Sequence, residues 1–133
     1  MVTKLSSAMT AFAGQLAPIG TLLPYAGSSA PTGWAMCDGN AVSRTTYSTL
    51  YTALGTTWGT GDGSTTFNLP DLRGRMLAGK DDMGAFGAAS RLTSGSHGLD
   101  GATLGADGGD VVASGSDSQG AVVNWIIRVG SDD

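Results

Sequence analysis

The sequence predicts an α+β fold, a small β-rich domain with one short helix at about residues 44–54, a glycine-rich insertion and an N-terminal amphipathic helix. Three observations predict this class. Short apolar runs are separated by turn residues, one run has the spacing of a helix, and Gly accounts for 22 of 133 residues, about twice its average usage. A chain of this length can bury one domain's core, so one domain is expected.

The first 16 residues carry apolar side chains at heptad spacing, and Pro18 ends the helix that they predict. We predict that residues 1–16 form an oligomerisation or attachment helix. Two interpretations stay open, because such a stripe joins subunits in a coiled coil or docks one helix on its own domain. The stripe consists of Val2, Leu5, Met9, Phe12 and Leu16.

Strands and tight turns follow from Gly20 onward. An apolar strand comes first, Pro31 and Gly33 make a turn, and a second strand passes through Trp34 and Cys37. This order is typical of a β-meander. Cys37 is the only cysteine, so it has no partner for an intrachain disulfide and is interpreted as a small buried apolar residue.

One short helix is predicted at about residues 44–54, with Ser43 as its N-cap and Gly55 at its C-cap. The prediction rests on apolar residues at i, i+3, i+4 and i+7, which place one stripe on the core. These residues are Tyr47, Leu50, Tyr51 and Leu54.

Charged residues gather in the stretch GDGSTTFNLPDLRGR, residues 61–75. It contains a predicted turn at Asp62 and a strand at residues 65–68. Two arginines at i and i+2 of an extended segment point to one side, where a nearby carboxylate can pair with one of them. We therefore predict that Asp71, Arg73 and Arg75 form a structural brace. An anion or sugar site is the alternative.

Gly, Ala, Ser and Asp dominate the insertion at about residues 81–120. A loop of this length inside a compact domain is usually functional or ordered by a partner. The chain then returns to a strand, VVNWIIRVG, so the insertion lies within a domain predicted to span residues 20–133. Alternation along this strand is expected to turn one set of side chains to one face: Val123, Trp125, Ile127 and Val129.

Composition argues against several functional classes. The net charge is −4 and the cations are scattered, so no nucleic acid partner is expected. No apolar run is long enough for membrane insertion or a signal peptide. His97 is the only histidine and no Glu occurs, so we predict neither an enzyme nor a cofactor. Carboxylates in a glycine-rich loop suit calcium, but the spacing of the Asp residues of the insertion fits neither an EF-hand nor a repeat array, and no metal site is predicted.

Residues 24–75 closely resemble the phage tail collar domain. The resemblance rests on GWAMCDGN, SRTTYSTLYTALGTTWGTGDG and TTFNLPDLRGR, and the closing VNWIIRV resembles that family's final strand. It implies a collar-type fold and a bacteriophage virion structural protein, made in the host cytoplasm and located in the tail. The function implied is that of a tail fibre tip or knob taking part in host receptor attachment. The alternative is an architectural capsid decoration or tail connector protein without receptor binding.

The resemblance also implies a homotrimer whose partners are other virion tail or baseplate proteins and a host surface glycan or protein. Many relatives carry paired histidines after the arginines, which in trimers can hold a metal; here the pair is missing. Under this interpretation the insertion does the recognition. The candidate receptor-binding residues are Arg91, His97, Asp100, Asp107, Asp110 and Asp117.

Overall fold

The computed structural model describes residues 17–85, 87–92, 100–108 and 120–130. The chain divides into two compact units. The first unit holds the described residues up to Arg73 and those from Ala121 onward, and the second holds those from Gly74 to Gly120. The predicted helix over residues 1–16 lies outside the described residues.

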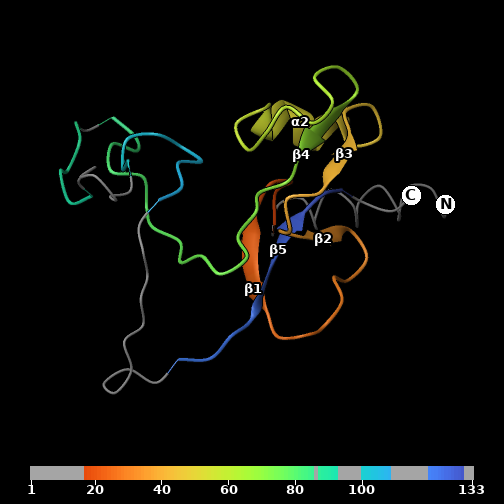
Figure 1. Cartoon of the computed structure of the whole chain (residues 1–133), viewed down its shortest axis with the longest axis horizontal. Coiled ribbons are helices and arrows are strands. Elements are labelled where there is room, and N and C mark those ends of the chain that lie inside the picture. The colour runs from red at the N-terminus through yellow and green to blue at the C-terminus, as the bar shows by residue number, and fades with distance from the viewer. Residues whose placement is uncertain (1–16, 86, 93–99, 109–119, 131–133) are drawn as a thin grey trace, which may run out of the picture. The chain divides into compact units, whose positions relative to one another are not determined.

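The first unit contains two antiparallel sheets and one short helix (Figure 1). This confirms the prediction of a small β-rich α+β fold. Three strands pair in the order β1-β5-β2, and the other two pair as β3-β4. The elements are β1 (Leu22–Tyr25), β2 (Trp34–Met36), β3 (Ala41–Ser43), α2 (Ser48–Leu54), β4 (Thr66–Asn68) and β5 (Asn124–Arg128).

Strand β5 comes last in sequence yet lies in the middle of its sheet, paired on both sides. Trp125, Ile127 and Val129 pack in the core, as the alternation predicted. The prediction was wrong for Val123, which precedes the strand and is 45% exposed. Ile126, on the opposite face, is also buried, because a central strand has neighbours on both edges.

Helix α2 begins at Ser48, later than the predicted start. Ser43 is the last residue of β3 and not the N-cap of the helix. Its hydroxyl accepts a hydrogen bond from the Thr46 N–H at 3.2 Å, so it closes the turn that precedes the helix. The predicted C-cap is confirmed: the Gly55 N–H donates to the Tyr51 carbonyl at 2.7 Å.

The core lies between the helix and the sheets. Leu50 and Phe67 are completely buried, and the predicted stripe of the helix packs with them. Cys37 is buried in the same cluster, and its burial, together with the charge of Asp38, raises the pKa of its thiol to about 12. This thiol is therefore protonated and unreactive at neutral pH, as expected for an apolar core residue.

Candidate functional site

Backbone hydrogen bonds join the segment from Asn68 to Leu72 to the segment from Cys37 to Asn40. The N–H groups of Leu69 and Leu72 donate to the carbonyls of Asn40 and Cys37, at 2.9 and 3.0 Å. In the opposite direction the Gly39 N–H donates to the Pro70 carbonyl at 3.2 Å. Leu69, Pro70 and Leu72 are buried, so the proline turn is anchored by apolar contacts as well as by backbone bonds.

Asp71 and Arg73 form a bidentate ion pair at the end of this segment. The guanidinium Nε and Nη2 donate to the two carboxylate oxygens at 2.8 and 2.9 Å. The side chains of Arg73 and Asp71 are 73% and 41% exposed, and water screens an exposed ion pair strongly. The pair therefore orients the loop, while the buried leucines and the backbone bonds hold it.

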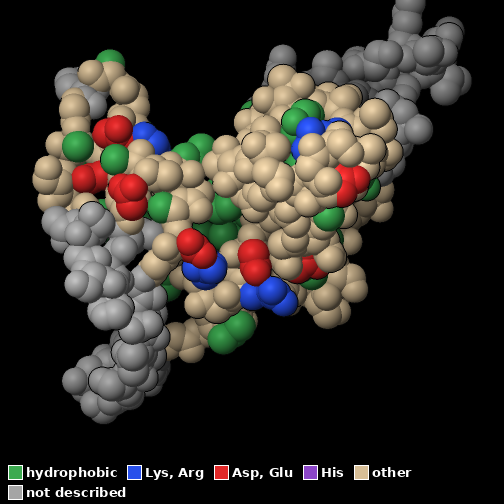
Figure 2. All heavy atoms as spheres, turned by 45° about the horizontal axis from the view of Figure 1, so that its top comes forward, with side chains coloured by type: hydrophobic (Ala, Val, Ile, Leu, Met, Phe, Trp, Pro, Cys, Tyr) green, Lys and Arg blue, Asp and Glu red, His purple; other side chains and the backbone are tan. Residues whose placement is uncertain are grey.

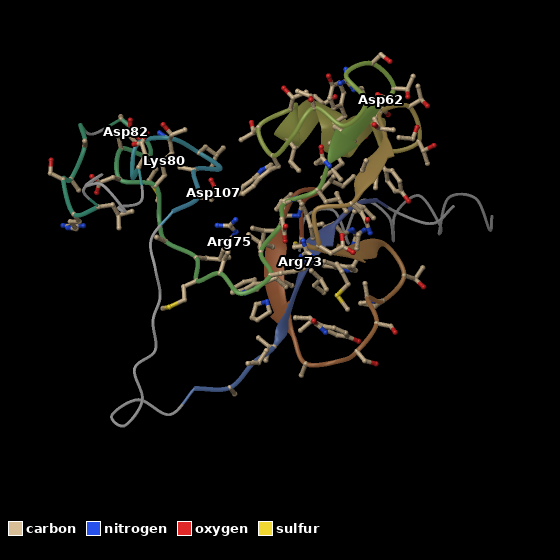
Figure 3. All side chains as sticks on the ribbon, in the orientation of Figure 1. Asp62, Arg73, Arg75, Lys80, Asp82 and Asp107 are labelled. Atoms are coloured by element: carbon tan, nitrogen blue, oxygen red, sulfur yellow. The ribbon has the colours of Figure 1, made fainter. Side chains whose placement is uncertain are left out.

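Arg75 forms an ion pair with another carboxylate. Within the second unit its Nη2 donates to Oδ2 of Asp107 at 2.9 Å (Figure 3). The partners are 32 residues apart in sequence, so the pair closes most of the described part of that unit into a loop. Each arginine of the predicted brace thus has a carboxylate partner, and the joint role of Asp71, Arg73 and Arg75 stays a prediction.

Asp62 organises the loop before β4. One carboxylate oxygen accepts hydrogen bonds from the N–H groups of Ser64, Thr65 and Thr66 at 2.7–2.9 Å, and the other accepts from the Thr65 hydroxyl. These bonds favour the charged form and hold the pKa of Asp62 well below its usual range. The carboxylate therefore takes the place of a backbone acceptor at this turn.

We expect this loop to loosen in acid. Because the pKa of Asp62 is lowered in the folded state, its contribution is complete above the unfolded pKa of about 3.9 and is lost as the pH falls toward the folded value. Hydrogen exchange of the Ser64 to Thr66 amides should therefore accelerate in Asp62→Ala at pH 7. The excess over wild type should shrink below about pH 4. Ser64→Ala is the control, and an equal acceleration there would contradict this role.

Arg44 is a loop-holding residue that the sequence analysis missed. Its Nε donates to the Thr66 carbonyl at 2.7 Å and its Nη2 to the Thr60 carbonyl at 3.2 Å. The guanidinium carbon also lies 4.9 Å from the centre of the Tyr51 ring. One side chain thus joins the glycine-rich loop to helix α2. Nothing local distinguishes this arginine, because its acceptors are carbonyls 16 and 22 residues away.

Arg44→Lys is expected to lower the free energy of unfolding by about 1–2 kcal/mol, because one ammonium group cannot reproduce the fork that reaches both carbonyls. Urea unfolding measures the loss. Arg73→Lys is the matched control and should cost less, because that pair is exposed. A larger loss in the control would show that the Asp71–Arg73 pair is the main brace.

The second unit is held by polar contacts. None of its described residues forms a helix or a strand, and Gly101 is the only one of them that is buried. Asp81 is its centre: the N–H donates to the Gly101 carbonyl at 2.6 Å, the carbonyl accepts from the Ala89 N–H at 2.9 Å, and the carboxylate accepts from the Arg91 N–H at 3.1 Å. The sequence did not single out Asp81 among the turn-forming aspartates.

The candidate receptor-binding residues differ in whether their side chains already have partners within the chain. The Asp100 carboxylate accepts from the Thr103 hydroxyl and the Ala102 N–H, which lower its pKa, and Asp107 is paired with Arg75. Within the described parts of the chain, no acceptor contacts the exposed Arg91 guanidinium. His97, Asp110 and Asp117, like the stripe residues Val2, Leu5, Met9, Phe12 and Leu16, lie outside the described residues, so their roles stay predictions.

On the face that Figure 2 shows, the charged side chains of the described residues are dispersed. Figure 2 shows acidic and basic side chains scattered or adjacent to one another, with no block of either sign. Lys80 pairs with Asp82 in this way. Among the residues that the structure describes, no three His, Cys, Asp or Glu side chains are grouped to hold a metal, and no helix is long and apolar enough to span a bilayer.

These features define a class of structural module, in which charged side chains and proline turns hold the chain's own loops around a small core. Residues 20–77 match the family model of the Phage Tail Collar Domain. This region of the chain is therefore similar to a phage tail collar domain, in agreement with the resemblance seen in the sequence. The two hydrogen-bonded segments, residues 37–40 and 68–72, and the Asp62 loop all lie inside the matched region.

A relative comes from Escherichia coli (strain K12). The chain is 36% identical over 69 residues to an uncharacterized protein, StfE. The match covers 52% of this chain and 33% of StfE, so the chain spans about a third of the length of this curated relative.

Proposed function

We propose that this chain forms a tail fibre tip or tail-associated knob that takes part in attachment to the host. In this proposal the collar domain is the mounted scaffold and the second unit contacts a host surface glycan or protein. The observation that supports it is the contrast between the units. The first has a buried core, whereas the described residues of the second expose polar backbone, small side chains and Arg91.

Small polar loops suit recognition of hydroxyl-rich surfaces, because backbone groups and short side chains can donate and accept hydrogen bonds with little rearrangement. Arg91 could add a charged donor for a carboxylate or a hydroxyl. Asp100 and Asp107 would act mainly through the loop conformations that they hold. No catalytic step is part of the proposal; turnover of a host polysaccharide by the purified chain would contradict that part.

The proposal predicts that deleting residues 95–110 removes adsorption to host cells while the first unit stays folded. Binding of the fluorescently labelled full chain to a panel of bacterial strains measures adsorption, and circular dichroism measures folding. Arg91→Ala should weaken adsorption with unchanged folding, and Arg73→Ala serves as the matched arginine control outside the second unit. Full adsorption after the deletion would assign recognition to another part of the protein.

The second candidate is a tail connector or capsid decoration protein without receptor binding. It is favoured by four exposed apolar side chains of the second unit, which suit a protein partner: Met76, Leu77, Met83 and Leu104, at 75, 42, 60 and 59% exposure. A glycan array separates the two functions, since a connector should bind no saccharide. The same side chains could meet across subunits of the proposed homotrimer, and a monomer in sedimentation would remove that part of the proposal.

A further inference from the structure

The three-stranded sheet carries large apolar side chains on both faces. Directly paired residues of a sheet share a face, so Leu22, Ile127 and Ala35 lie together, and all three belong to the core cluster or pack against it. The next positions along the strands face the opposite way. We call this second set the outer sheet face: Leu23, Tyr25, Trp34, Met36, Asn124, Ile126 and Arg128.

None of the outer-face residues packs against the core cluster. The other elements of the unit place their buried side chains in that cluster, with Leu50 from α2, Val42 from β3 and Phe67 from β4. No described helix or strand therefore remains to form a layer over the outer face. The centre of this face is buried whereas its edge is exposed, since Ile126 is 3% exposed and its neighbour Leu23 is 43% exposed.

Arg128 places a buried hydrogen-bond donor at one end of this face. It pairs with Trp34 in the register, and its guanidinium carbon lies 5.9 Å from the centre of that ring. The Nε atom is buried and has no hydrogen-bond partner among the described residues. An occupant of the outer face should therefore bring apolar side chains and a hydrogen-bond acceptor near Arg128.

We propose that residues 1–16 of the same chain cover the outer sheet face with their heptad stripe. The segment joins the structure at the end of this sheet, because the Gly20 N–H donates to the Arg128 carbonyl at 2.9 Å. Just before that point the backbone and hydroxyl of Thr21 both donate to the Pro18 carbonyl, which reverses the chain at the start of β1. The first sheet face is already filled by the core.

The length of residues 1–16 and the polarity of a helix formed by them agree with this proposal. A helix of 16 residues is about 24 Å long and a strand of four residues about 13 Å, so the stripe can cross the whole sheet. The last carbonyls of such a helix lack partners and carry partial negative charge. They would end close to Pro18, two residues before the Gly20 N–H that donates to the Arg128 carbonyl. Residues 1–16 contain no carboxylate, so these carbonyls are their strongest acceptors.

Photo-crosslinking in the full chain tests the proposal. A benzophenone amino acid at position 12, on the stripe, should crosslink to peptides containing Leu23, Met36 or Ile126. The same probe at Ala8, off the stripe, should do so much less. A 1:1 mixture of ¹⁵N-labelled and unlabelled chains identifies the donor, because crosslinks within one chain never combine the two isotopes. Mixed-isotope crosslinks, or equal yields from the two positions, would overturn it.

Methyl NMR gives a second measurement with a conservative change. Phe12→Leu keeps the stripe apolar but removes an aromatic ring current, so at least one methyl resonance of Leu23, Met36 or Ile126 should shift. The methyl resonances of Met83 and Leu104, in the second unit, are the controls and should stay in place. If the outer-face resonances are unchanged, the segment does not lie on this face.

Discussion

Phe67→Ala is expected to lower the free energy of unfolding by about 3–5 kcal/mol, the usual cost of truncating a buried aromatic side chain. Phe67 is completely buried in the middle of β4. Its ring centre lies 5.1 Å from that of Tyr51, with the two planes tilted by 49°. The substitution therefore opens a cavity between the helix and the sheets and removes an aromatic contact as well.

Such a loss is a large part of the 5–15 kcal/mol that stabilises a typical domain. Urea unfolding followed by tryptophan fluorescence should show a lower midpoint with an unchanged slope. Val122→Ala is the control, because Val122 is fully exposed and its truncation should change little. A loss below about 1 kcal/mol for Phe67→Ala would mean that the cavity collapses or that the core lies elsewhere.

Gly61→Ala has the second largest expected effect, a loss of about 2–4 kcal/mol. Gly61 has a φ of +58°, a conformation that costs an L-residue energy. A Cβ there would also lie 2.3 Å from the Thr66 hydroxyl oxygen and 2.6 Å from the Thr66 carbonyl carbon. Since one of these atoms is backbone, the loop must open, and the bond from the Gly61 N–H to Asn68 Oδ1 would be strained with it.

Gly63→Ala separates the cost of the positive φ from the cost of the close approach to Thr66. Gly63 also has a positive φ, +85°, but a Cβ there would meet nothing within 4 Å. Its substitution should therefore show only the backbone penalty, and urea unfolding should rank Gly61→Ala as clearly less stable. Equal losses for the two variants would show that the close approach to Thr66 is relieved without cost.

Local patterns in the sequence predicted the elements that local chemistry controls. The helix stripe and its glycine C-cap were found, because spacing and capping involve residues within one or two turns. Strand β3 was missed and Ser43 was interpreted as a helix N-cap. A serine can close a turn or cap a helix with the same hydroxyl, and three residues are too few for a strand signal.

For the charged residues, the sequence predicts their grouping better than their partners. Opposite charges were recognised in the stretch from Gly61 to Arg75, but their partners could not be assigned. Asp71 pairs with an arginine two residues away, whereas Arg75 pairs with a carboxylate 32 residues away. Arg44 and Asp81 hold loops through backbone groups, which leave no signature in the sequence.

The two proposed functions place different demands on the second unit. A receptor-binding loop should tolerate substitution of its exposed apolar side chains and depend on polar ones such as Arg91. A connector should show the reverse, because Met83 and Leu104 would be buried against a partner. Substituting each set separately and measuring adsorption and particle assembly would therefore distinguish them.

By itself, the sequence determined the class of the protein: the turn residues, the helix stripe and the collar-like motif are all properties of neighbouring residues, whose preferences act before the chain has folded. Only the tertiary structure decided which surfaces and charges meet. It placed the last strand in the centre of the sheet, gave that sheet a second apolar face and paired Arg75 with a carboxylate 32 residues away. Contacts of this kind join residues far apart in sequence, so they exist only once the folded chain has brought those residues together.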